Sequence, residues 1–191
     1  MKVKMLELLK RTEPVTQLVL STRTLIRVPS LLLRIYQMKK LCLISSFVSY
    51  VPREIFCLPN LELLDLSDNL ISSLPFEEIV DTNENYYIAS EDSPRISKTL
   101  KYINLSKNLL QSVGMSFNAL EGVETLILSH NDLRKLPDMS NLRNCLCKLD
   151  TTNNKLRQLV GVENLCHLEE LSVARNLLQH LPDLSNSQHS L

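Results

Sequence analysis

Apolar residues recur along this chain in a fixed frame that repeats seven times. The seven segments begin at Val15, Met38, Leu61, Leu100, Val123, Leu146 and Leu168. In all of them, frame positions 1, 4, 6, 11 and 14 are apolar, with Thr151 as the one exception. Successive segments begin 22 or 23 residues apart, except for one interval of 39 residues. A fixed period of this length predicts a solenoid in which each repeat packs only against its neighbours.

Each segment is predicted to contain one short strand. Positions 4 and 6 are two residues apart, so their side chains share the inner face of the strand, while positions 3, 5 and 8 face solvent. Stacking the segments then gives a parallel sheet with one strand from each repeat. The proline that often follows at position 15 ends the strand direction and begins the return.

Position 9 carries an asparagine in five of the seven repeats: Asn69, Asn108, Asn131, Asn154 and Asn176. An amide side chain both donates and accepts, so stacked asparagines can satisfy backbone groups that the turn leaves buried and unpaired. Arg23 and Ser46 occupy this position in the first two repeats. We therefore expect those repeats, residues 15–58, to be looser than the rest and to open first.

The frame resembles the consensus LxxLxLxxNxLxxLP of the leucine-rich repeat family over residues 15–184. This resemblance implies an α/β fold, a right-handed solenoid of about seven repeats with a parallel sheet on its concave face. The 40 leucines and three glycines in 191 residues agree with such a repeat better than with an ordinary globular core.

The return segments between strands follow two patterns. Repeats one, two and four are apolar at positions 18 and 21, similar to the Ras-interacting type of leucine-rich repeat: Leu32, Ile35, Ile55, Leu58, Phe117 and Leu120. Repeats five and six are apolar at positions 17 and 20, which resembles the phosphatase-1 regulatory-subunit type: Met139, Leu142, Val162 and Leu165. Both types are intracellular, and the mixture leaves the subfamily open.

Three segments lie outside the frame. Residues 1–14 can form a short helix that caps the first repeat, because solenoids need their exposed ends covered. An acidic insertion near residues 80–95 is expected to bulge as a surface loop. The alternative is a functional segment, with Tyr86 and Tyr87 docking a partner or Ser93 before Pro94 phosphorylated. The polar tail, residues 185–191, offers no comparable cap, so either a partner covers the last repeat or the chain is part of something longer.

Charge and cysteine content indicate a compartment and exclude some partners. The 21 basic residues balance the 21 acidic ones, whereas a dedicated nucleic-acid or membrane-surface binder carries a basic excess. The apolar stretch near Met1 is too short and too interrupted by charges for us to expect a signal peptide, and no apolar run reaches membrane-spanning length. The five cysteines are an odd number in apolar surroundings, which favours reduced thiols and a cytoplasmic or nuclear protein.

Two clusters were weighed as reactive sites. The first could in principle bind zinc, but its spacing matches no standard zinc motif, and we interpret its cysteines as buried or half-buried thiols: Cys145, Cys147, Cys166 and His167. The second pairs His130 with Asp150 as a base and its orienting carboxylate, but no nucleophile accompanies them. We therefore predict no metal, no cofactor and no enzymatic activity.

The predicted binding surface lies on the concave face. Leu63, Tyr102 and Ile127 come from consecutive strands and are expected to form an exposed apolar patch. Polar residues are expected to surround this patch: Asp65, Asp68, Asn104, Lys107, His130 and Asp150. An apolar patch with a charged rim is typical of a protein interface, with Tyr102 as its best anchor.

The sequence therefore predicts a non-enzymatic interaction module or scaffold that binds a protein partner. The resemblance to intracellular types suggests signalling or phosphatase regulation. The alternative is the recognition segment of a larger enzyme, such as a ubiquitin ligase or a cyclase. No nucleic-acid, membrane or small-molecule partner is expected, because the surface carries neither a basic stripe nor a glycine-rich phosphate loop.

Overall fold

The computed structural model describes residues 14–21, 25–28, 30–75, 98–113, 120–182 and 184. The expected cap up to residue 13, the insertion at 80–95 and the tail at 185–191 lie outside the described residues.

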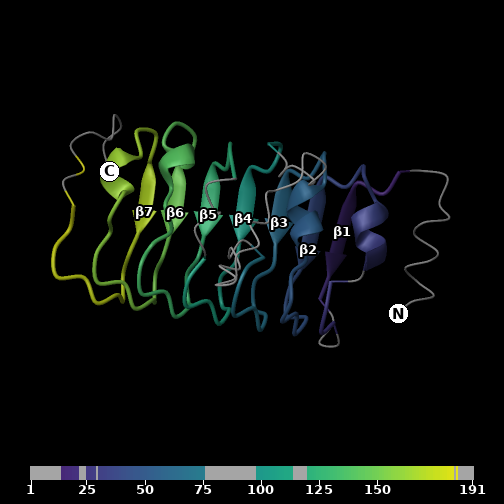
Figure 1. Ribbon diagram of the computed structural model, residues 1–191, viewed down its shortest axis with the longest axis horizontal. Coiled ribbons are helices and arrows are strands. Elements are labelled where there is room, and N and C mark those ends of the chain that lie inside the picture. The colour runs from purple at the N-terminus through teal and green to yellow at the C-terminus, as the bar shows by residue number, and fades with distance from the viewer. Residues whose placement is uncertain are drawn as a thin grey trace, which may run out of the picture.

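Seven short strands form one parallel sheet in chain order (Figure 1). They are β1 (Gln17–Leu20), β2 (Lys40–Leu43), β3 (Leu63–Asp65), β4 (Tyr102–Asn104), β5 (Thr125–Ile127), β6 (Lys148–Asp150) and β7 (Glu170–Ser172). The sheet stays in register across the long interval, because Leu64 of β3 pairs with Ile103 of β4. The predicted one strand per repeat is confirmed, and the insertion does not interrupt the ladder.

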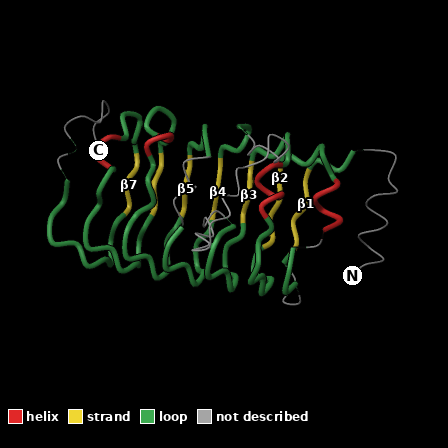
Figure 2. Tube along the Cα trace, in the orientation of Figure 1, coloured by secondary structure: helices red, strands yellow, loops and turns green. Residues whose placement is uncertain are grey.

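The returns on the other side of the solenoid are short (Figure 2). They contain the 3-10 helices η1 (Ser30–Arg34), η2 (Arg53–Cys57), η4 (Ser140–Leu142) and η5 (Val162–Asn164). No α-helix occurs among the described residues, so the helical part of the expected α/β fold is supplied by single tight turns. Both return patterns bury their apolar positions: Leu32, Ile35, Ile55, Leu58, Leu120, Met139, Leu142, Val162 and Leu165.

The core is a continuous column of side chains from the frame positions that the pattern marks as apolar. In repeats three to six, positions 4, 6 and 11 are completely buried. Thr151, the exception to the frame, is completely buried as well, and its Oγ1 donates a hydrogen bond to the Ser172 carbonyl at 3.3 Å. Its hydroxyl is therefore satisfied within the core.

The asparagines at position 9 form the predicted ladder. Asn131 is representative: its Nδ2 donates to the carbonyls of Leu105 and Leu128, both at 3.0 Å. Its Oδ1 accepts a hydrogen bond from the Leu110 amide at 3.0 Å. Equivalent bonds to the preceding repeat recur at Asn69, Asn108, Asn154 and Asn176. Each amide thus joins two repeats through backbone groups that would otherwise be buried without partners.

The turn after each strand has a backbone conformation that the sequence analysis missed. Six residues at position 8 have φ between 50° and 57°, in the left-handed region: Ser45, Asp68, Lys107, His130, Asn153 and Arg175. Except for Arg175 in the last repeat, their amides bond to the next repeat, as in the 2.9 Å bond from Asp68 N to the Ser106 carbonyl. This conformation directs the position 8 side chains to solvent at the end of the sheet, as predicted. None of these residues is glycine. Asp68, His130 and Asn153 are of types that favour this region, but Ser45, Lys107 and Arg175 gave no signal for the turn.

The first repeat is expected to exchange its backbone amides fastest. Ser46 occupies the ladder position of repeat two, and its Oγ donates to the Ile44 carbonyl at 3.0 Å. A hydroxyl has one hydrogen to donate, whereas each ladder amide donates two hydrogen bonds and accepts another. Asn69 does tie repeat two to repeat three, which moves the weak junction to the boundary between repeats one and two. Hydrogen exchange should therefore show lower protection over residues 15–35 than over 100–181. Equal protection in both regions would contradict this prediction.

Candidate functional site

The candidate site is the solvent-facing side of the sheet, called here the sheet face and made of positions 3, 5 and 8. In strands β3 to β6, half-buried residues at positions 3 and 5 flank a buried position 4. Two columns follow from the strand register. One column contains Leu63, Tyr102, Thr125 and Lys148, and the other contains Asp65, Asn104, Ile127 and Asp150.

The predicted apolar patch is present in part. Leu63 and Tyr102 are direct neighbours in one column, but Ile127 belongs to the other column, next to Asn104. All three apolar residues are half-buried rather than fully exposed. The reason is the close spacing of parallel strands, about 4.8 Å, which lets side chains on adjacent strands cover one another. Val19 on β1, by contrast, is 58% exposed.

Tyr102 is held between the two columns by its phenol. Burial raises the pKa of this phenol above its ordinary value, and the nearby Asp65 carboxylate raises it further. A side-chain hydrogen bond with Asn104 lowers the pKa of the phenol, but this effect is smaller than that of burial. The hydroxyl group therefore stays protonated at neutral pH and lies over the polar column, where a partner can use it as a donor.

The polar residues at position 5 have a structural role that the sequence analysis missed. Each accepts a hydrogen bond from the backbone amide two residues later, which closes a turn at the end of the strand. The bonds are Ser67 N to Asp65 Oδ1 at 2.9 Å, Ser106 N to Asn104 Oδ1 at 3.0 Å and Thr152 N to Asp150 Oδ1 at 2.9 Å. The recurrence of Asp or Asn two residues before Ser or Thr was the available signal. The remaining polar atoms of two of these side chains bond to each other, because Asn104 Nδ2 donates to Asp65 Oδ2 at 3.3 Å.

The predicted residues at position 8 lie at the exposed end of the sheet face. Asp68 accepts a hydrogen bond from the Ser45 hydroxyl of the preceding repeat. His130 Nδ1 lies 3.0 Å from Asn153 Nδ2 of the next repeat. Among the described residues, no ion pair involves Lys107.

His130 and Asp150 do not form a catalytic pair in this structure. The histidine bonds to Asn153, whereas the Asp150 carboxylate is engaged by the Thr152 amide. No hydrogen bond joins the two side chains among the described residues. The geometry therefore gives no support to the hydrolytic alternative.

The cysteines are free thiols spread over the solenoid. Cys145, Cys147 and Cys166 each donate to a nearby backbone carbonyl at 3.4–3.5 Å. Burial is the main cause that raises the pKa of Cys42, Cys57, Cys145 and Cys147, so these groups stay as protonated thiols. Within the part of the chain that the structure describes, no three His, Cys, Asp or Glu residues converge to hold a metal.

Comparison with solved structures shows which fold this is. A leucine-rich repeat protein of Leptospira interrogans superimposes with a TM-score of 0.66 over 97% of this chain and 56% of its own length. The two share 21% sequence identity, so the likeness is one of fold. This chain is a leucine-rich repeat solenoid.

Curated relatives of the solenoid agree with this assignment. The human oligodendrocyte-myelin glycoprotein is 32% identical over 137 residues, which are 68% of this chain and 31% of the relative. The human serine/threonine-protein kinase 11-interacting protein is 33% identical over 116 residues, 60% of this chain and 11% of the relative. The solenoid thus spans less than a third of either protein. No family model matches the chain.

The relatives point to a protein-protein interaction module as the general role of the solenoid. They do not select between the two repeat subtypes that the return patterns resemble. Among the described residues, no helix is both long and apolar enough to cross a membrane.

Proposed function

We propose that this solenoid is a non-enzymatic interaction module that binds a protein partner on its sheet face. The main support is the arrangement around Tyr102, where an aromatic anchor beside Leu63 is surrounded by polar groups already fixed by hydrogen bonds. Asn104 Nδ2, for example, donates to Asp65 Oδ2 at 3.3 Å across the two strands. A surface ordered before binding loses little conformational entropy when a partner docks.

The charges on the sheet face favour a protein over a polyanion. Lys107 and Lys148 alternate with Asp65, Asp68 and Asp150, and Lys148 is paired with a glutamate on β7. A surface of mixed sign selects a partner with a complementary pattern rather than any polyphosphate. The five free thiols support a cytoplasmic or nuclear location, and the intracellular repeat types support a role in signalling or phosphatase regulation.

A second candidate is that the solenoid recognises substrates for a larger enzyme. The observation that favours it is length: the curated relatives extend well beyond the matched repeats. A longer transcript that encodes a catalytic domain next to these repeats would support this alternative. This second candidate also requires binding at the sheet face, because the recognition surface would be unchanged.

Partner capture should depend on the sheet face. The variant Leu63→Glu/Tyr102→Ala is expected to lose at least about 90% of the partner recovered by the wild type, since interface anchors carry most of the binding energy. The measurement is quantitative affinity purification with mass spectrometry, after circular dichroism confirms that the variant is folded.

The matched control for this experiment is Leu177→Glu/Tyr36→Ala. Both residues are exposed, at 57% and 65%, and both lie away from the sheet face. The control should retain the partner. Recovery of the same partners with both variants would mean that the sheet face is not the binding surface.

A further inference from the structure

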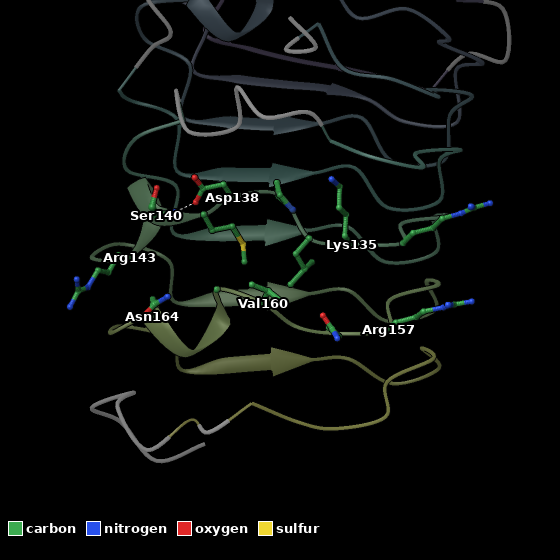
Figure 3. A pocket seen from close by; sticks show the side chains of 13 residues that line it. Lys135, Asp138, Ser140, Arg143, Arg157, Val160 and Asn164 are labelled. Carbon is green, nitrogen blue, oxygen red and sulfur yellow. Dashed lines mark hydrogen bonds between the residues drawn. The ribbon is translucent and has the colours of Figure 1, made fainter.

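A groove lies between the return segments of repeats five and six, on a different surface from the sheet face (Figure 3). Its volume is about 1000 Å³. Leu136, Pro137, Met139 and Val160 supply apolar surface to it, and Val160 is 69% exposed. Figure 3 shows Val160 between Arg143 at one end and Arg157 with Lys135 at the other.

The groove arises from a local departure from the repeat frame. Repeat six has Val160 where most repeats have a proline, and Gly161 follows with φ of 92°, in the left-handed region. A side chain placed on Gly161 would meet no atom within 4 Å, so the space beside it is open. Among the described residues, backbone bonds join the two repeats at Lys155 and at Cys166, on either side of the groove, and none joins residues 134–142 to 156–164.

The charged residues in the lining are mostly basic. Arg134, Lys135, Arg143 and Arg157 are all exposed, against a single lining carboxylate, Asp138. One oxygen of that carboxylate already accepts a hydrogen bond from the Ser140 amide at 2.9 Å. None of the four basic side chains forms an ion pair with a described residue.

Arg134 and Arg157 carry like charges at matching positions of neighbouring repeats, unlike the ion-paired positions of the solenoid. Both occupy position 12, in consecutive repeats, so two like charges are stacked directly. Elsewhere, matching positions of neighbouring repeats carry opposite charges: Lys39 Nζ is 3.1 Å from Glu62 Oε1, and Lys101 Nζ is 2.8 Å from Glu124 Oε1. Like charges at matching positions of neighbouring repeats repel each other, and a bound anion would relieve the repulsion.

We propose that this groove binds an acidic segment of a protein partner in an extended conformation, with an apolar side chain over Val160 and carboxylates at both ends. Charge complementarity selects the acidic residues, and the apolar surface selects a peptide over a bare polyanion. Arg143 would contact one end of the segment, and Arg134 with Arg157 the other. The site is separate from the proposed sheet face, so one module can hold two parts of a partner at once.

Selection from a library of displayed random 12-residue peptides tests this proposal. Peptides selected on the wild-type chain should combine several acidic residues with at least one large apolar residue. By fluorescence anisotropy, Arg134→Glu/Arg157→Glu should weaken their binding by at least about tenfold, because it reverses the charge that steers and holds the peptide. The control Arg34→Glu/Arg53→Glu makes the same charge change at exposed positions in the returns of repeats one and two, and should weaken binding less than about twofold, as expected for remote charges screened by salt.

Several outcomes would overturn the proposal. The first is a selection that yields no acidic peptides, or acidic peptides that bind the Arg134→Glu/Arg157→Glu variant as well as the wild type. The second is selected peptides that lose binding to Leu63→Glu/Tyr102→Ala instead, which would place them on the sheet face. The third is a single-stranded oligonucleotide that competes for the groove more tightly than every selected peptide, which would make it a nucleic-acid site. Circular dichroism of each variant establishes that it is folded.

Discussion

The variant Asn131→Ala is expected to lose a large part of the stability of the solenoid. The side chain is buried, and it donates to the carbonyls of Leu105 and Leu128 and accepts from the Leu110 amide. Alanine would leave these backbone groups without partners in a space too apolar for water to replace the amide well. Each unsatisfied buried group costs about 1–3 kcal/mol, so the free energy of unfolding should fall by at least about 3 kcal/mol. Urea unfolding followed by circular dichroism measures this loss.

Asn176→Ala is the matched control for the ladder. Asn176 makes the same kinds of bond, to the Thr151 and Val173 carbonyls and from the Leu156 amide, but it is only half-buried in the last repeat. In Asn176→Ala, water can reach the backbone groups that lose their partner. The loss in the free energy of unfolding should therefore be about half that of Asn131→Ala or less. Equal losses for both variants would show that burial of the ladder is not what makes Asn131 important.

The sheet and its ladder could be predicted because both depend on residues that recur at fixed positions. Leu64 and Ile103 stack in register although 39 residues separate them, since each occupies position 4 of its own repeat. The asparagine at position 9 was predicted from its chemistry alone, because few side chains both donate and accept. In a repeat protein, residues at the same frame position of neighbouring repeats contact each other. The positions of the repeats along the sequence therefore predict the contacts and the fold.

The candidate site was harder to predict, because its properties depend on neighbours that the frame does not describe. The half-burial of Leu63 and Tyr102 comes from side chains on adjacent strands, which differ from repeat to repeat. The backbone at position 8 is left-handed at Lys107 and Arg175, residue types that carry no preference for it. These features result from packing rather than from the local sequence.

The groove escaped prediction for a different reason. The sequence signal for the groove is Val160, which replaces the usual proline and is followed by Gly161. A repeat frame is defined by residues that recur, so a residue that differs in one repeat does not contribute to it. Identical repeats would stack without gaps, so a surface specific for one partner has to arise where a repeat differs from its neighbours. Both the acidic insertion and this groove are such places, which is why irregular positions are the better guide to function in this fold.

Replacing Leu126 by alanine is expected to cause the other large loss of stability. Leu126 is the central residue of β5, completely buried between Ile103 of β4 and Leu149 of β6. Truncation removes buried apolar surface and leaves a cavity between rigid neighbouring strands. A change of this kind typically costs about 2–5 kcal/mol, and a central repeat with neighbours on both sides should fall in the upper part of that range. The same urea titration measures it.

Leu171→Ala tests whether the position in the stack decides the cost. Leu171 has the same place in β7 but pairs only with Leu149, and it is half-buried. Leu171→Ala should lower the free energy of unfolding by less than half as much as Leu126→Ala. The contact with a neighbouring repeat is lost on one side only, and the last repeat can relax around the gap. If Leu171→Ala destabilised the chain as much as Leu126→Ala, stability would be shared uniformly along the stack. The solenoid would then unfold as a single unit rather than from its ends.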